Sequence, residues 1–152
     1  MLTRADHDDE TLERLVREML ERDGATAGLG GTLLPVRDGK MTFRLEIRPE
    51  HLNSHTICHG GVLATMLDTV AGLSVCQEDR VPVTVSSSIN YFYPARLGQT
   101  VEVIGVQSTA TDRYRTALAH AIGPDGAILT TMHAVFRLLD KPPTILKEEE
   151  GK

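Results

Sequence analysis

The chain has 152 residues, of which 41% are hydrophobic and 24% are charged, and its formal net charge is -5 at pH 7. This length predicts one domain with a substantial core, and the negative charge argues against nucleic acid as a partner. Its two cysteines, Cys58 and Cys76, form no disulfide framework, and no apolar signal segment stands at the N-terminus. Both features predict a cytoplasmic protein.

The N-terminal segment carries leucine, valine and methionine at helical spacing, and acidic residues open it. This pattern predicts an amphipathic helix over about residues 8–23 that packs on the edge of the domain, with Gly24 as its stop. Residues 28–31 are rich in glycine and predict a loop. Because no strand precedes them, they do not form a nucleotide-binding fingerprint.

Several segments alternate between apolar and polar side chains and predict strands. Residues 41–48 alternate in this way, and Asp38-Gly39 before them predicts a hairpin with residues 32–36. Four longer strands are predicted after the middle of the chain, over residues 83–93, 100–108, 113–122 and 127–139. Their short connections predict a meander in which consecutive strands are antiparallel neighbours.

Between these two groups of strands, residues 62–75 are almost wholly apolar. They predict a buried helix of about 14 residues, roughly 21 Å long, which is too short and too interrupted by Asp68 to span a membrane. A long helix followed by antiparallel strands predicts an α+β fold, with a curved sheet wrapped around a central helix. We expect one domain over residues 1–140 and a disordered tail over residues 141–152.

Asp68 is the only charged residue of the predicted central helix. Its helical neighbours at three and four positions are all small, namely Ala64, Thr65, Ala71 and Gly72. No residue of the helix can therefore pair with the carboxylate. An aspartate that simply faces water is one interpretation, but the apolar surroundings favour a carboxylate that meets a ligand.

Gly60 and Gly61 stand where this helix begins. The first backbone N–H groups of a helix lack intrahelical acceptors and lie at the positive end of the helix dipole. Such groups can bind an anion, or a carbonyl oxygen that gains negative charge during a reaction. The alternative is that the two glycines only permit a tight turn into the helix.

The preceding loop also contains residues that could form a metal site or a cysteine nucleophile. His51, His55 and His59 recur every four residues beside Cys58, but such a set shares one face only on a helix, and the glycines predict a loop. No metal site is therefore expected. Cys58 could act as a nucleophile with a histidine and an aspartate, although adjacent residues of an extended loop point in opposite directions.

One stretch carries a recognisable signature, Asn53-Ser54-His55-Thr56-Ile57-Cys58-His59-Gly60-Gly61, with Asp68 eight residues after the first glycine. It resembles the hotdog-fold acyl-CoA thioesterases of the PaaI type, from the phenylacetic acid degradation family. Tyr91-Phe92-Tyr93-Pro94-Ala95 is similar to a later strand of that family. The first 30 residues match poorly, and Thr56 stands where the family often has glycine.

The resemblance implies hydrolysis of acyl-CoA, with phenylacetyl-type acyl groups favoured, in phenylacetate degradation. A thioester is already reactive, so the enzyme must position water or a carboxylate and stabilise the charge on the carbonyl oxygen. Asp68 is expected to be nucleophile or general base, and the Gly60 N–H to bind the oxygen. Asn53 is expected to hold the carbonyl or the water, and Thr84, by similarity, to orient the water or the carboxylate.

The remaining site residues are expected to bind substrate. They are His59, Gly61, His55 and Cys58 in the loop, and Arg113 for the coenzyme A phosphates, with Arg80, Arg96 and Arg115 as other candidate cations. Ordinary surface ion pairs are the simpler interpretation of each arginine. Tyr91, Phe92 and Tyr93 are expected to pack against the helix or a partner chain. Coenzyme A is part of the substrate, so no cofactor is expected.

Gly60 and Asp68 are eight residues apart on one helix, about 12 Å along its axis. They cannot act on the same carbonyl group unless one comes from a second chain. The resemblance likewise implies a homodimer with shared active sites, and further assembly into a dimer of dimers, a homotetramer.

Two other classes of function stay open. A hotdog hydratase or dehydratase of acyl thioesters would be expected to use a histidine and a carboxylate. A non-enzymatic acyl-CoA-binding protein would keep the pocket and the dimer but would tolerate the loss of Asp68.

Overall fold

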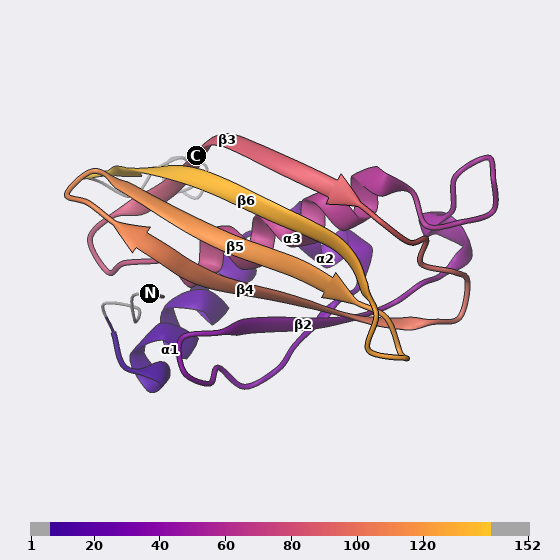
Figure 1. Cartoon of the computed structure of the whole chain (residues 1–152). Coiled ribbons are helices and arrows are strands. Elements are labelled where there is room, and N and C mark those ends of the chain that lie inside the picture. Colours follow the sequence, from indigo (N-terminus) through magenta and orange to yellow (C-terminus); the bar gives the residue numbers. More distant parts are fainter. Residues whose placement is uncertain (1–6, 141–152) are drawn as a thin grey trace, which may run out of the picture.

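A computed structural model describes residues 7–140 of the chain. Figure 1 shows one curved sheet with one long helix lying along it. In chain order the elements are α1 (Asp9–Leu20), α2 (Gly24–Leu29), β1 (Thr32–Leu33), β2 (Met41–Glu46), η1 (Pro49–His51), α3 (Gly60–Ser74), β3 (Val81–Tyr91), β4 (Thr100–Ala110), β5 (Tyr114–Ile122) and β6 (Ile128–Leu139). The tail predicted to be disordered, residues 141–152, lies outside the described residues.

The central helix α3 is buried, as the apolar run predicts. The side chains of Met66, Leu67 and Val70 are fully inaccessible to water, and they pack against β2, β4 and β5. Phe43 of β2 is 2% exposed on the same inner face of the sheet. Burying side chains of this size is worth about 1.5–3 kcal/mol each, which is why the apolar pattern places this helix in the middle of the fold.

The six strands are ordered β1-β2-β4-β5-β6-β3, and every neighbouring pair is antiparallel. The hairpin of residues 32–36 with β2 and the meander of β4, β5 and β6 are confirmed. The prediction that β3 lies beside β4 is wrong, because β3 pairs with β6 along ten residue pairs. The connection over residues 92–99 is long enough to cross the end of the sheet, so β3 and β4 need not be neighbours.

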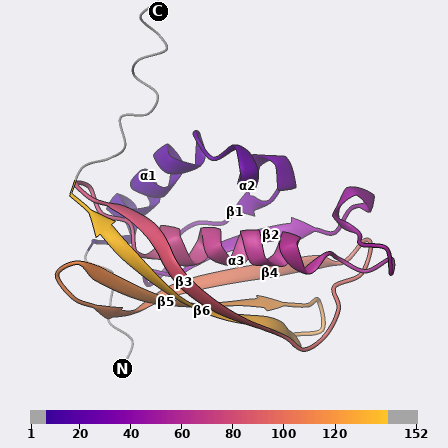
Figure 2. The same cartoon turned by 90° about the horizontal axis from the view of Figure 1, so that it is seen from above.

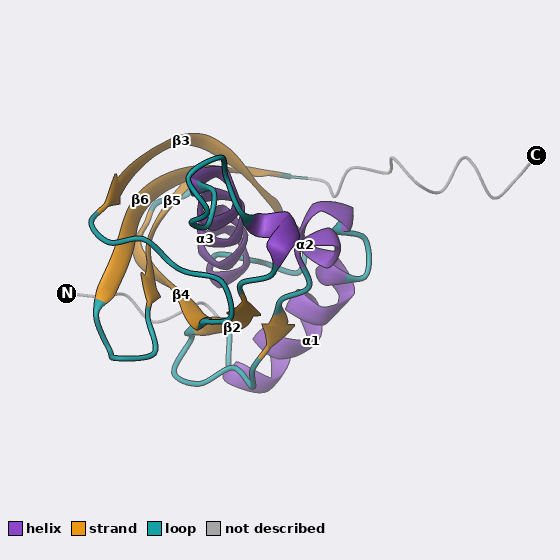
Figure 3. Ribbon diagram, turned by 90° about the vertical axis from the view of Figure 1, so that its right-hand side faces the viewer, coloured by secondary structure: helices purple, strands orange, loops and turns teal. Residues whose placement is uncertain are grey.

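The sheet curls around α3 far enough to bring β3 over the helix (Figure 3). One position makes the close packing of helix and sheet possible. A Cβ atom at Gly105 of β4 would lie 2.4 Å from the carbonyl oxygen of Val70 in α3, so only glycine allows β4 to approach the helix this closely.

The strand β3 forms one edge of the sheet, and its outer edge has no partner among the described residues. Its side chains are unusually open to solvent for a long strand, since Val83, Val85 and Tyr91 are 44%, 57% and 52% exposed. An edge strand presents a row of unpaired N–H and C=O groups to another strand. The structure therefore leaves a pairing surface open along β3.

The helices α1 and α2 lie on the side of α3 away from the sheet (Figure 2). The predicted N-terminal helix over about residues 8–23 is confirmed as α1, which ends at Leu20, but Gly24 begins α2 instead of stopping a helix. Asp23 is the N-cap of α2 and accepts a hydrogen bond from the Thr26 N–H. The loop predicted over residues 28–31 is accordingly shorter, and it begins at Gly30, whose φ is 78°.

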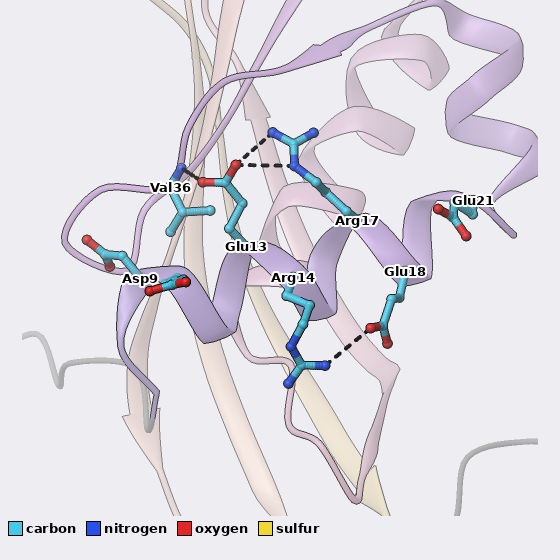
Figure 4. Close-up of a pocket in the computed structure, with 8 residues that line it drawn as sticks. Asp9, Glu13, Arg14, Arg17, Glu18, Glu21 and Val36 are labelled. Carbon is cyan, nitrogen blue, oxygen red and sulfur yellow. Dashed lines mark hydrogen bonds and ion pairs between the residues drawn. The ribbon is translucent and has the colours of Figure 1, made fainter.

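The outward side of α1 forms a charged groove of about 590 Å³ (Figure 4). Four of its charged side chains are paired, with Glu13 bonded to Arg17 and Arg14 bonded to Glu18. Glu13 also accepts a hydrogen bond from the Val36 N–H, which ties the helix to the segment before β2. No helix within residues 7–140 has both the length and the apolar composition needed to cross a membrane.

Candidate active site

The loop before α3 is organised by Asn53. Its side-chain oxygen accepts hydrogen bonds from the N–H groups of His55 and Ile57, at 2.9 and 3.3 Å, and its own N–H donates to the Ile57 carbonyl oxygen. The side-chain NH₂ group of Asn53 has no acceptor within residues 7–140. The loop therefore uses the acceptor half of the amide and leaves its donor half available.

Thr56 lies at the tip of this loop with φ of 62°. A β-branched residue rarely adopts this left-handed conformation, whereas glycine adopts it freely. The loop thus keeps the shape that a glycine would favour at this position, and it keeps that shape at a cost in conformational energy.

His59 caps α3, and its Nδ1 atom accepts a hydrogen bond of 2.8 Å from the Gly61 N–H. A Cβ atom at Gly61 would lie 2.9 Å from the same nitrogen, so glycine permits this contact. Because Nδ1 accepts, the proton of the neutral ring lies on Nε2. The Gly61 N–H is therefore occupied, while the Gly60 N–H has no acceptor among the described residues.

Tyr91, at the end of β3, lies against this helix terminus, in agreement with its expected packing on the helix. Its hydroxyl group donates a hydrogen bond of 2.9 Å to the Gly60 carbonyl oxygen. A Cβ atom at Gly60 would lie 3.3 Å from the tyrosine ring. Burial raises the pKa of Tyr91 above its ordinary value, which keeps the hydroxyl protonated and able to donate. We call this group of Asn53, His59, Gly60 and Tyr91 the Gly60 region.

Two turns further along α3, Thr84 of β3 donates a hydrogen bond of 2.8 Å to a carboxylate oxygen of Asp68. Asp68 is half-buried and forms no ion pair with any residue from 7 to 140. Its carboxylate therefore keeps a free oxygen. We call Asp68, Thr84 and the cavity beside them the Asp68 region.

The cavity beside Asp68 has a volume of about 190 Å³ and is lined by Asp68, Thr69, Gly72, Thr84 and Phe136, among others. At Gly72 an added Cβ would lie 3.4 Å from the Phe136 ring, so a larger residue here would pack against that ring and take up space in the cavity. Met19 and Asp23 also line the cavity. The sequence predicts only a packing role for the N-terminal segment. The spacing of Asp23 and Thr26, which is typical of a helix N-cap, could have indicated that a second helix begins here.

The two regions do not meet within one chain. Gly60 and Asp68 belong to the same straight helix, so about 12 Å of helix axis separates them. The structure places Asn53 in the loop that leads into Gly60 and bonds Thr84 to Asp68, and the length of the helix separates Gly60 from Asp68.

The other candidates in the loop lie in contrasting surroundings. His55 is exposed, whereas Cys58 is only 5% exposed and contacts the His59 carbonyl oxygen at 3.7 Å. Burial raises the pKa of the Cys58 thiol to about 11, so the thiolate that nucleophilic attack requires is scarce near neutral pH. His51 is buried, and its two ring nitrogens are bonded to the Arg48 N–H and the Leu29 carbonyl oxygen.

Within the described part of the chain, no three His, Cys, Asp or Glu side chains are grouped closely enough to hold a metal ion. Among the arginines, Arg80 is paired with Asp112 and Asp140, and Arg115 is buried against the carbonyl oxygen of Thr111. The Arg113 side chain is exposed and has no ion pair or hydrogen bond with residues 7–140.

Comparison with known proteins agrees with this fold. Residues 55–106 match the Thioesterase superfamily. A Halobacterium salinarum protein whose name describes it as an esterase is 31% identical over 106 residues, covering 62% of this chain and 70% of the relative. Human acyl-coenzyme A thioesterase 13 is 29% identical over 97 residues, covering 62% and 69%.

Among solved structures, a variant of the phenylacetic acid degradation protein PaaI from Thermus thermophilus superposes with a TM-score of 0.72 and 25% identity, covering 77% of this chain and 100% of the other. The chain belongs to the thioesterase superfamily and is a hotdog-fold enzyme of the PaaI type. The expected curved sheet around a central helix is thereby confirmed.

Proposed function

We propose that the protein hydrolyses the thioester bond of acyl-CoA, with Asp68 as nucleophile or general base. The observation that carries this proposal is the Asp68 carboxylate, bonded on one oxygen to Thr84 at 2.8 Å, open on the other, and facing a cavity of about 190 Å³. The acyl-coenzyme A thioesterase activity named for the human relative supports the same reaction.

The donors of the Gly60 region suit the oxygen of the thioester carbonyl. The Gly60 N–H and the Asn53 NH₂ group are free of protein acceptors within the described chain, while the Asn53 oxygen and the Gly61 N–H are used to hold the loop. Donors fixed in advance stabilise the charge that develops on the carbonyl oxygen without any reorganisation during the reaction. Asn53 therefore acts on the carbonyl oxygen, and His59 and Gly61 act by shaping the loop.

Asp68 completes the reaction by one of two routes. As a base, it removes a proton from water while the water oxygen bonds to the carbonyl carbon; as a nucleophile, its own oxygen forms that bond, and water hydrolyses the resulting anhydride. In both routes the C–S bond breaks, the coenzyme A sulfur leaves with the electron pair and takes up a proton, and the free acid remains. Thr84 holds one carboxylate oxygen so that the other faces the substrate.

The acyl group is proposed to be ring-bearing, of the phenylacetyl type. A cavity of about 150 Å³ is large enough to take up benzene, and the cavity at Asp68 is somewhat larger, about 190 Å³. The similarity to a phenylacetic acid degradation protein supports this choice. The exposed and unpaired Arg113 is the proposed partner of the coenzyme A phosphates, because charge-assisted hydrogen bonds to phosphate are among the strongest available.

The active form is proposed to be a homodimer that pairs the open edges of two β3 strands. Two residues of β3 contact the two regions: Tyr91 is bonded to Gly60, and Thr84 is bonded to Asp68. An antiparallel pair that sets Thr84 of one chain opposite Tyr91 of the other has its two-fold axis near Ser87 and Ser88, whose small side chains allow close approach. Each site then takes its donors from one chain and its carboxylate from the other, and two such dimers form the expected tetramer.

The direct test is a panel of acyl-CoAs assayed with a reagent that detects free thiol, on the wild-type protein and on Asp68→Ala. The panel includes phenylacetyl-CoA, saturated acyl-CoAs and one enoyl-CoA. Thiol release by the wild type and its loss in the variant support the proposal. Loss of the conjugated absorbance of the enoyl-CoA without thiol release would indicate a hydratase, and tight binding with no turnover of any substrate would indicate a binding protein.

A further inference from the structure

The N-terminal helices contribute two side chains, Met19 and Asp23, to the cavity beside Asp68. Both residues lie outside the segment that matches the Thioesterase superfamily, residues 55–106. The catalytic carboxylate of the proposed reaction therefore belongs to the family segment, whereas part of the wall around its substrate comes from outside that segment.

Met19 lines two cavities. One is the cavity of about 190 Å³ at Asp68. The other has a volume of about 390 Å³, and its wall combines two apolar residues with several polar or charged ones, namely Leu15, Val81, Glu18, Arg22, Gln77, Glu78 and Arg80. Met19, which is 37% exposed, is the one lining residue that the two cavities share. A side chain in this position limits how far an acyl group can extend from Asp68 toward the second cavity.

The Met19 side chain is held in place from α3. Its sulfur atom lies 3.0 Å from the thiol sulfur of Cys76, which follows the end of that helix. Burial raises the pKa of the Cys76 thiol to about 12, so the thiol keeps its proton and can donate to the thioether. A methionine anchored in this way closes the cavity more firmly than its flexible side chain alone would.

Asp23 is likewise fixed relative to the catalytic helix. Its two carboxylate oxygens contact the N–H and the hydroxyl group of Thr26, at 3.0 and 2.7 Å. The Thr26 hydroxyl lies 2.9 Å from that of Thr69, the residue after Asp68. The cavity therefore carries two carboxylates on its wall, and within residues 7–140 neither forms an ion pair.

We propose that the end of α1 and the N-cap of α2 select the acyl group, Met19 by limiting its length and Asp23 by rejecting acyl groups that end in a carboxylate. This inference rests on the proposed thioesterase function and specifies its substrate. An acyl chain longer than the first cavity meets the Met19 side chain, and a terminal carboxylate meets the charge of Asp23 in a confined space, where like charges repel strongly.

The length limit is tested with saturated acyl-CoAs of increasing chain length and the variant Met19→Ala. Shortening the Met19 side chain should open the first cavity toward the second. For acyl groups just longer than the wild-type limit, kcat/KM should then rise at least about tenfold, which is the effect of one methylene group that does not fit a pocket. Arg17→Ala is the matched control, because it shortens a long side chain of the same helix that points into the outward groove of Figure 4. The control should keep the wild-type profile.

The charge selection is tested with a pair of substrates of equal length, hexanoyl-CoA and adipoyl-CoA, and the variant Asp23→Asn. Asparagine is as good an N-cap as aspartate, so α2 should persist, and the preference for hexanoyl-CoA over adipoyl-CoA should fall about tenfold as the repulsion disappears. Asp8→Asn makes the same change at the N-cap of α1, away from the cavity, and should leave the preference unchanged. Thermal unfolding of all four variants shows whether they are folded.

The outcomes separate this inference from the function on which it rests. If the wild type releases thiol but folded Met19→Ala keeps the wild-type length profile, or folded Asp23→Asn keeps the wild-type preference, the corresponding assignment is overturned while the thioesterase function stands. If the wild type hydrolyses none of the substrates, the proposed function itself fails. A profile that shifts equally in the controls would mean that the N-terminal segment acts through stability alone, which also overturns the inference.

Discussion

The Gly60 region and the Asp68 region lie on one helix but differ in chemistry. The Gly60 region stands at the helix terminus and offers donors, namely the free Gly60 N–H and the NH₂ group of Asn53. The Asp68 region lies in the middle of the helix and offers an acceptor, a carboxylate with one oxygen held by Thr84. Thioester hydrolysis needs both at one carbonyl group, so in the proposed reaction each region supplies half of the site.

The two regions also differ in how they are held. In the Gly60 region, the side chains of Asn53 and His59 accept hydrogen bonds from backbone N–H groups within nine residues of chain, and Tyr91 of β3 adds one bond from a distant segment. The Asp68 region depends on residues distant in sequence, because Thr84 comes from β3 and Met19 and Asp23 come from the N-terminal helices. The Gly60 region is therefore held mainly by local contacts, whereas the Asp68 region is held mainly by contacts between distant segments.

The largest effect is expected from Asp68→Asn. The amide keeps the shape of the side chain but cannot act as base or nucleophile, so turnover should fall at least ~10²-fold. Affinity for an unreactive acyl-CoA analogue should stay the same or increase, and the melting temperature should not fall, because a half-buried charge without a cationic partner costs stability. Near-normal turnover, or activity lost only in proportion to unfolded protein, would make Asp68 a structural residue.

The role of the Gly60 N–H as a hydrogen-bond donor is tested by Gly60→Pro, with Gly60→Ala as its control. Proline removes the N–H but is well tolerated at the first position of a helix, and Gly60 follows directly on the His59 cap. Loss of one oxyanion donor should lower turnover by about 10²–10³-fold. Alanine keeps the N–H and adds a Cβ near Tyr91, so it should retain much more activity; equal losses in the two variants would point to crowding at Tyr91 instead.

A smaller effect is expected on stability from Thr56→Gly in the loop of the Gly60 region. Glycine relieves the left-handed conformation that threonine adopts at φ of 62°, which should stabilise the protein by about 1 kcal/mol after the greater freedom of glycine in the unfolded chain is subtracted. The shift of the urea unfolding midpoint measures it. Ser54→Gly, in the same loop without a positive φ, should instead be neutral or destabilising, and the opposite order would exclude strain at Thr56.

The smallest effect is expected from blocking cysteine. The raised pKa of Cys58, about 11, means that the thiolate forms only as the pH approaches that value; at pH 8 about one molecule in a thousand carries it. Turnover should therefore survive treatment with iodoacetamide at pH 7–8, and Cys58→Ala should stay active. Inactivation that tracks modification of Cys58, and that a substrate analogue prevents, would return the nucleophilic cysteine to consideration.

Much of the fold was accessible from the sequence because its signals are local. The alternation in residues 41–48 and the apolar run of residues 62–75 each predicted an element from its own periodicity. The pairing of β3 with β6 was missed because strand order depends on contacts between distant segments, and no pattern within residues 83–93 specifies the partner. The break at Asp23 was missed because the glycine after it was interpreted as a stop, although a capping aspartate directly before a glycine can also start a helix.

The same difference between local signals and contacts of distant segments applies to the candidate site. Asn53, Gly60 and Asp68 were accessible because they lie in one short motif whose chemistry is unusual for an apolar helix. Thr84 came only from the family resemblance, and the structure gives it a physical role through its hydrogen bond to Asp68. Tyr91 was expected to pack on the helix, but its hydrogen bond to Gly60 was not. Met19 and Asp23 have ordinary sequence surroundings, and only the folded chain brings them to the cavity.

Mixing two inactive variants tests most directly whether the site is shared between chains. Asn53→Ala and Asp68→Ala are dissociated together and allowed to reassociate in equal amounts, with exchange of chains verified by mass. If each site takes Asn53 from one chain and Asp68 from the other, half of the dimers contain both variants, and each of these has one intact site. About a quarter of the wild-type turnover should then return. No return of activity, despite verified exchange, would contradict a site formed by two chains.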